Sequence, residues 1–156
     1  DENKNQYVLF IDLSNMAEST ILDVLGDYFL DQEGNEKSLK DVTNPPIFGV
    51  YFTGFWCPPC RIFTPILKDF YEDVNGDAEV VEKTLEIVLV SCDQADEEYQ
   101  EQMKDAPWLT IPFDDKERVE ILKKFHNIVG IPTLVLYTRD GTRLNVPARA
   151  DIQRYR

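Results

Sequence analysis

The chain has little histidine, cysteine or positive charge, and each shortage excludes a class of protein. One histidine and three cysteines stand among 156 residues, and an odd cysteine count in a chain of this size cannot form a disulfide framework. Sixteen basic residues against 29 acidic ones give a net charge of −13. This acidity argues against a nucleic-acid partner, because phosphate binding needs a basic surface. No apolar run approaches the roughly 20 residues that span a bilayer, so we expect no membrane partner.

Composition predicts one packed core. Hydrophobic residues make up 43% of the chain and aromatic residues 12%, which is enough for a domain of ordinary size without disulfides. We expect a single domain over residues 1–156, with residues 1–25 as an N-terminal extension. No signal peptide is visible, and the start at Asp1 rather than Met leaves open a targeting segment that has been removed. The predicted location is the cytoplasm, with the nucleus as a second compartment.

Apolar runs alternate with amphipathic stretches, which predicts an α/β domain. Strands are expected at residues 7–13, 47–52, 85–90, 133–137 and 143–146, and a hairpin turns at residues 34–35. Helices are expected at residues 38–42, 62–75 and 93–106, and after a capping box of Asp114 and Glu117. Strands separated by helices pair in parallel, and the turn at residues 139–141 adds an antiparallel edge. The expected sheet is mixed, with helices on both faces.

Two cysteines occupy the junction between a predicted strand and a predicted helix, in the stretch FTGFWCPPCRIFTP. Cys57 opens the helix, where free backbone N–H groups and the helix dipole favour a thiolate, the nucleophile in disulfide exchange. Cys60 lies one turn further on and less exposed, so it can attack a mixed disulfide on Cys57. Pro58 and Pro59 have no N–H group, which leaves the amide of Cys60 as the main local donor to Cys57. Pro59 falls in the first helical turn.

Two other interpretations of the pair are weaker. A structural disulfide across so short a loop constrains little of the unfolded chain and stabilises little. A zinc site needs two more ligands, and Cys92 and His126 lack the paired spacing of zinc motifs. The sequence therefore favours a redox dithiol that needs no metal and no organic cofactor.

A second loop is predicted opposite Cys57. The stretch Gly130-Ile131-Pro132-Thr133 enters the strand at residues 133–137, and a proline there suggests a cis bond that turns the backbone sharply. Ile131 would then offer its backbone N–H and C=O to an extended substrate, in the manner of strand addition. An ordinary trans proline at a strand entrance is the alternative.

These motifs together resemble the thioredoxin superfamily, and within it the tryparedoxin/nucleoredoxin family. The resemblance covers roughly residues 26–150 and rests on four stretches: WCPPCRIFTPILKDFY, VLVSCD, PWLTIPFDD and GIPTLVLY. It implies a thioredoxin-like fold, with Cys57 as the attacking cysteine, Cys60 as the resolving one, Trp56 as the ring covering the site and Pro132 as a cis-proline. Arg149 aligns loosely with a basic position near the tryparedoxin site.

The predicted site therefore has two catalytic residues and six substrate-binding ones. The catalytic residues are Cys57 and Cys60; the substrate-binding residues are Trp56, Pro58, Pro59, Ile131, Pro132 and Arg149.

The chain departs from the resembling families at two positions. Ordinary thioredoxins carry a buried Asp six residues before the first cysteine, where this chain has Tyr51, so a proton acceptor for Cys60 has to be found elsewhere. Tryparedoxins often have Trp where this chain has Cys92, which we expect to be a buried, inert thiol.

Trp108 is expected to pack in the core. His126 is expected near a helix C-terminus, where the helix dipole explains it without a catalytic role.

The predicted function is the reduction of protein disulfides, such as those of peroxiredoxins, by a monomeric oxidoreductase. A small dithiol or a reductase would restore the pair. A nucleoredoxin-like module that binds a client and uses the dithiol as a switch is the second hypothesis. A secreted or periplasmic thiol reductase tethered to a membrane is the third, although such proteins usually have an acidic residue where this chain has residues 63–65.

Overall fold

The computed structural model describes residues 20–76 and 82–155, so the predicted strand at residues 7–13 lies outside the described part of the chain. The described strands are β1 (Phe29–Leu30), β2 (Glu36–Lys37), β3 (Ile47–Thr53), β4 (Leu85–Ser91), β5 (Leu109–Thr110) and β6 (Thr133–Thr138). The described helices are α2 (Ile21–Leu25), α3 (Leu39–Thr43), α4 (Pro58–Asn75), α5 (Asp96–Met103), α6 (Lys116–Phe125) and α7 (Ala148–Arg154).

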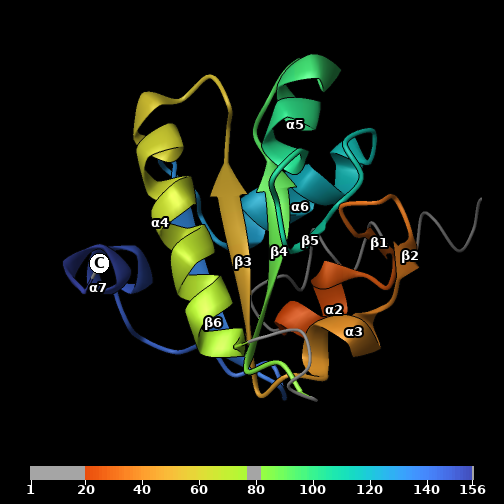
Figure 1. Ribbon diagram of the computed structural model, residues 1–156. Coiled ribbons are helices and arrows are strands. Elements are labelled where there is room, and N and C mark those ends of the chain that lie inside the picture. Colours follow the sequence, from red (N-terminus) through yellow and green to blue (C-terminus); the bar gives the residue numbers. More distant parts are fainter. Residues whose placement is uncertain (1–19, 77–81, 156) are drawn as a thin grey trace, which may run out of the picture.

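The six described strands form one mixed sheet in the order β2-β1-β5-β4-β3-β6 (Figure 1). β3 pairs in parallel with β4, and β4 with β5, as expected for strands joined by helices. β1 and β2 form the predicted antiparallel hairpin. The predicted α/β fold with a mixed sheet is therefore confirmed.

Helices cover both faces of the sheet because the central strands are apolar on both sides. Phe48, Val50 and Phe52 of β3 pack into the core cluster that includes residues of α2, α3 and α6. Tyr51 belongs to the opposite cluster, with residues of α4, α5 and α7. All seven residues of β4 are buried, which accounts for its nearly unbroken apolar run.

Several predicted elements were wrong in detail. β6 runs antiparallel to β3, because the chain enters β6 at the end of the sheet where β3 finishes, with Thr133 opposite Phe52. Residues 143–146 form no strand in the described structure; Arg143 makes an isolated bridge to Tyr137. Asp115 rather than Asp114 caps α6, accepting a hydrogen bond from the Arg118 N–H at 3.2 Å.

Other elements were missed or overextended. The short helices α2 and α7 and the two-residue strand β5 were not predicted, and α5 is shorter than the polar stretch at residues 93–106. α4 ends at Asn75, as predicted, with Gly76 as its C-cap, whereas α3 begins one residue later than predicted, with Ser38 as its N-cap. Among the described residues, no helix is both long enough and apolar enough to cross a bilayer.

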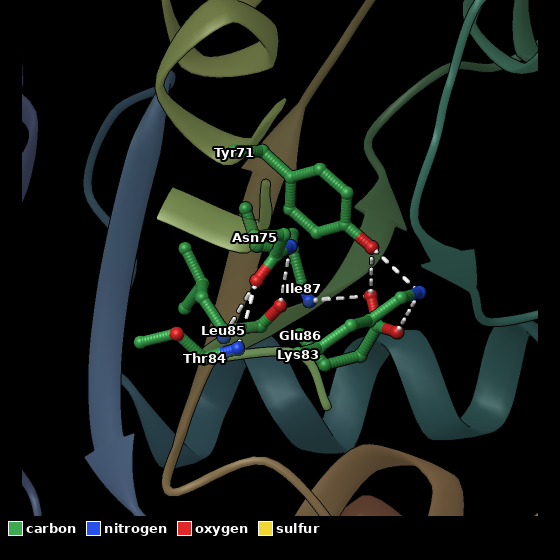
Figure 2. A network of polar contacts seen from close by, with 7 residues as sticks. All are labelled: Tyr71, Asn75, Lys83, Thr84, Leu85, Glu86 and Ile87. Atoms are coloured by element: carbon green, nitrogen blue, oxygen red, sulfur yellow. Dashed lines mark hydrogen bonds and ion pairs between the residues drawn. The ribbon is translucent and has the colours of Figure 1, made fainter. Parts of the chain in front are cut away.

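A buried carboxylate joins the end of α4 to the start of β4 (Figure 2). Glu86 is only 3% exposed, and its oxygens accept from the Tyr71 hydroxyl at 2.9 Å, the Lys83 ammonium at 3.0 Å and the Ile87 N–H at 3.0 Å. Burial raises the pKa of this carboxyl, and Lys83 opposes that effect. Asn75 completes the junction, with its side chain bonded to the backbone of Thr84 and Leu85. These contacts fix the end of the sheet opposite the cysteines.

We expect Tyr71→Phe to lower the free energy of unfolding by about 1–2 kcal/mol, because a buried carboxylate then loses one donor. Tyr155→Phe is the matched control, since the Tyr155 side chain is 78% exposed. Urea unfolding at neutral pH measures both variants. Equal effects of the two substitutions would contradict a structural role for the Tyr71–Glu86 hydrogen bond.

Candidate active site

Cys57 sits at the N-cap of α4, and its sulfur faces the first turn of the helix. The Cys60 N–H donates to Cys57 Sγ at 3.3 Å, as expected for a turn in which Pro58 and Pro59 have no N–H to offer. The fixed φ of these prolines also suits the first helical positions. Cys57 is 4% exposed and Cys60 1% exposed, so Cys57 is the cysteine nearer to solvent.

The loop before β6 faces Cys57 from the other side. The Ile131–Pro132 peptide bond is cis, as the sequence predicts. The Cys57 thiol points its Sγ at the Ile131 carbonyl oxygen, 3.8 Å away. Residues 74 positions apart in the chain are thus brought together, and the backbone of Ile131 lies beside the reactive sulfur.

The three thiols are free and differ in surroundings. Burial raises the pKa of Cys60 to about 11, and the neighbouring Cys57 side chain adds to this effect. Cys60 therefore stays protonated at neutral pH. Burial also raises the pKa of Cys92 to about 11, and a thiol that stays protonated is a poor nucleophile. Cys92 is half-buried rather than buried as predicted, and its raised pKa is consistent with the predicted inertness.

Trp56 lies beside the cysteine pair with half of its surface exposed. Its indole N–H donates to the Cys92 carbonyl oxygen at 3.1 Å, which ties the ring to the end of β4. The ring also lies against Gly54, where an added Cβ would come within 2.7 Å of Trp56 Nε1. Glycine at that position is therefore required for this placement of the ring.

Asp93 anchors the loop that carries the cysteines, and it was not predicted as a site residue. This buried carboxylate accepts from the Phe55 N–H at 2.7 Å and the Ser91 hydroxyl at 2.7 Å, and it also bonds the Gln102 amide. One signal was present in the sequence: Asp93 follows a buried strand that lies next to β3, so both strands end at the same edge of the sheet. The polar composition of residues 93–106 hid it among helix residues.

Arg149 reaches the back of the cis-proline loop from α7. Its Nη1 donates to the Pro132 carbonyl oxygen at 3.5 Å, and its guanidinium lies over the Phe63 ring at 6.0 Å. The structure thus places Arg149 against the loop that faces Cys57. In this position it can hold Pro132 in place.

Tyr51 occupies the position where ordinary thioredoxins have a buried acid. Its ring packs edge-on against Phe63 and Trp108, and its hydroxyl lies 2.7 Å from the Thr64 hydroxyl. Burial raises its pKa to about 12, so the phenol stays neutral and is no general base at physiological pH. Trp108 is buried and packs between Tyr51 and Tyr71, as predicted.

The structure corrects the interpretation of His126. Burial lowers its pKa to about 4, so the ring is neutral at pH 7 and has no charge for the helix dipole to stabilise. Two hydrogen bonds hold it instead: Nδ1 to the Leu122 carbonyl oxygen and Nε2 to the Tyr137 hydroxyl, each at 2.7 Å. With both nitrogens occupied, this ring is not available to a metal. Within residues 20–76 and 82–155, no group of His, Cys, Asp and Glu side chains is placed to hold a metal ion.

A sequence model of the thioredoxin-like family matches residues 45–142, the segment that holds both cysteines and the cis-proline. Tryparedoxin of Trypanosoma brucei brucei is 36% identical over 121 residues, 77% of this chain and 80% of that protein. Nucleoredoxin of Danio rerio is 38% identical over 104 residues, 67% of this chain but 24% of that protein. The chain thus spans about a quarter of this nucleoredoxin.

Solved structures agree. Tryparedoxin I of Crithidia fasciculata superposes with a TM-score of 0.75 at 31% identity, covering 87% of this chain and 92% of that one. A thioredoxin of Wuchereria bancrofti superposes with a TM-score of 0.71 at 36% identity, covering 81% and 85%. The chain belongs to the tryparedoxin/nucleoredoxin family of the thioredoxin superfamily, a class of thioredoxin-like oxidoreductases.

We expect Asp93→Asn to lower the free energy of unfolding by about 1–3 kcal/mol, because an amide replaces one acceptor oxygen that buried donors need. Amide hydrogen exchange at Phe55 should quicken as its acceptor weakens. Asp69→Asn, at an exposed position of α4, is the control. Unchanged exchange at Phe55 would contradict the anchoring role of Asp93.

His126 should make stability depend on pH in a defined window. Its folded pKa of about 4 lies below the ordinary 6.5, so the unfolded chain takes up the proton first. The stabilisation is therefore present above pH 6.5 and is lost as pH falls toward 4. We expect the difference in unfolding free energy between the wild type and His126→Gln to shrink by about 2 kcal/mol from pH 7 to pH 5. A constant difference in urea unfolding at the two pH values would refute this.

Proposed function

We propose that the protein is a thiol–disulfide oxidoreductase that reduces protein disulfides, with Cys57 as the attacking and Cys60 as the resolving cysteine. The observation that carries this proposal is the free thiol pair at the start of α4, where the Cys60 N–H supports Cys57 Sγ. A negative sulfur is the species that this hydrogen bond and the helix N-terminus favour. The sulfur also lies beside the cis Ile131–Pro132 bond.

The reaction has two steps. The Cys57 thiolate attacks one sulfur of the client disulfide, a Cys57–client disulfide forms, and the other client sulfur leaves as a thiolate. Cys60 then loses its proton and attacks Cys57 Sγ. The Cys57–Cys60 bond forms, the bond to the client breaks, and the electron pair leaves with the second client sulfur. The client gains two electrons and the protein loses two.

A protein client fits the surface around the pair. Trp56 is 50% exposed and Val129, two residues before Ile131, is 94% exposed. These apolar side chains flank the cysteine loop and the cis-proline loop. An extended client segment could lie between them and bond the backbone of Ile131, as strand-adding peptides do. We propose that the clients are of the peroxiredoxin type, as the family resemblance implies.

The electron donor is proposed to be a small thiol or dithiol, with a reductase as the alternative. One of the superposed structures, at 28% identity and a TM-score of 0.72, is a tryparedoxin II complexed with glutathionylspermidine. That relative supports a low-molecular-weight thiol as a candidate for this chain. The monomeric state and the cytoplasmic location stay predictions from the sequence.

A second candidate function follows from the nucleoredoxin relatives. The chain spans about a quarter of the Danio rerio protein, in which the matching region is one part of a longer protein. In that setting the dithiol would act as a switch on client binding rather than as a catalyst. Turnover separates the two functions, because a binding module keeps its client after Cys57→Ser and shows negligible steady-state reduction.

We expect Cys57→Ser to abolish reduction of insulin or a peroxiredoxin by the protein when dithiothreitol supplies the electrons, because the remaining thiol of the pair, Cys60, is buried and protonated. Cys60→Ser should instead accumulate a mixed disulfide between Cys57 and the client, visible on a non-reducing gel. Cys92→Ser is the control and should keep activity within about twofold, since its thiol is protonated and outside the pair. Full activity of Cys57→Ser would overturn the proposed mechanism.

A further inference from the structure

A pocket of about 320 Å³ lies beside the cysteine pair and is lined by side chains of both α4 and α5. Its inner wall includes the buried side chains of Cys60 and Trp108. Its outer wall includes Arg61, Glu101 and Asp105, which are exposed. The pocket therefore connects the resolving cysteine with solvent, on a path separate from the loop at Ile131 that faces Cys57.

Two features give the inner wall a polar character. The Trp108 indole N–H is buried and finds no acceptor among the described residues, and such a donor is ordinarily satisfied by ordered water. Thr64 also lines the pocket. It lies four residues after Cys60 in α4, so the two side chains are neighbours on one helix face. The Thr64 hydroxyl is held from behind by the Tyr51 hydroxyl at 2.7 Å.

The attack of Cys60 on the mixed disulfide requires a site that accepts the Cys60 proton. Cys60 is a protonated thiol in a buried position, and it must lose its proton before it attacks Cys57. Tyr51 is itself a neutral phenol. The polar groups at the Cys60 thiol are the Cys57 thiol, the Thr53 hydroxyl and the Gly54 backbone; no carboxylate or imidazole of the described residues is among them. A pocket of this volume holds several waters, since each takes about 30 Å³.

We propose that this pocket is the proton exit of Cys60, in which the Thr64 hydroxyl, backed by Tyr51, positions a water that accepts the Cys60 proton. The proton passes from Cys60 Sγ to that water and then to solvent or to the carboxylates of Glu101 and Asp105. The Cys60 thiolate attacks Cys57 Sγ, the Cys57–Cys60 bond forms, and the client thiolate leaves. Thr64 is a positioning residue in this scheme, and the inference rests on the proposed dithiol function.

The two steps can be timed separately with dithionitrobenzoate, an aromatic disulfide that releases a coloured thiolate. Attack by reduced Cys57 releases the first thiolate, and attack by Cys60 on the mixed disulfide releases the second. Stopped-flow traces are recorded from pH 6 to pH 9 on the full chain in a Cys92→Ser background, so that only the pair reacts. Failure of the first phase would count against the proposed function itself, whereas this inference concerns the second phase.

We expect Thr64→Val to slow the second phase on the order of tenfold, below the full range of general acid–base effects because water still enters the pocket. The first phase should stay within about twofold, and the second should reach half its maximal rate at a higher pH. Thr64→Ser keeps the hydroxyl and should restore both the rate and the pH profile. Tyr51→Phe keeps the ring packing and should slow the second phase alone.

Three results would overturn the inference. One is a second phase in Thr64→Val that matches the wild type across the pH range. Another is an equal slowing of both phases in both the Thr64→Val and Tyr51→Phe variants, which would indicate a general disturbance of α4. The third is a Thr64→Ser variant as slow as Thr64→Val, because the hydroxyl would then have no part in the step.

Discussion

The hydrogen bond from the Cys60 N–H to Cys57 Sγ is the contact on which the other features of the site depend. It exists because Pro58 and Pro59 have no N–H and because their φ angles suit the first turn of α4. It holds Cys57 Sγ beside the Cys60 N–H. The Cys60 side chain lies beneath, and this residue is only 1% exposed. One turn of helix thus gives two chemically similar side chains different surroundings, and the division into attacking and resolving roles follows from those surroundings.

Three elements keep that turn in place. Asp93 at the end of β4 holds the loop before Cys57, through the Phe55 N–H. The cis Ile131–Pro132 bond brings a carbonyl oxygen to the reactive sulfur, and Arg149 of α7 contacts that loop from behind. At the far end of the sheet, Tyr71 and Lys83 bond the buried carboxylate of Glu86 and fix β4 against α4. The cysteine pair is therefore supported at both ends of the same strand and helix.

The sequence was sufficient for the dithiol and for the central strands, because both leave local signals. The CPPC spacing indicated the dithiol, and the apolar runs of β3 and β4 indicated buried strands. The proline after Ile131 indicated the cis bond. What the sequence missed depends on distant contacts. Asp93 acts through the Phe55 amide, 38 positions away, and β5 is two residues long and exists by pairing with its neighbours. His126 was misinterpreted because its burial, which sets its charge, is a property of the packed fold.

The central claim is that Cys57 is the nucleophile and Cys60 a protected thiol, and site-resolved alkylation tests it most directly. The reduced protein is treated with iodoacetamide at pH 7, and modification at each cysteine is followed by mass spectrometry. The account predicts rapid modification of Cys57, while Cys60, whose pKa burial raises to about 11, stays unmodified until the protein unfolds. Modification of Cys60 as fast as that of Cys57 in the folded protein would contradict it.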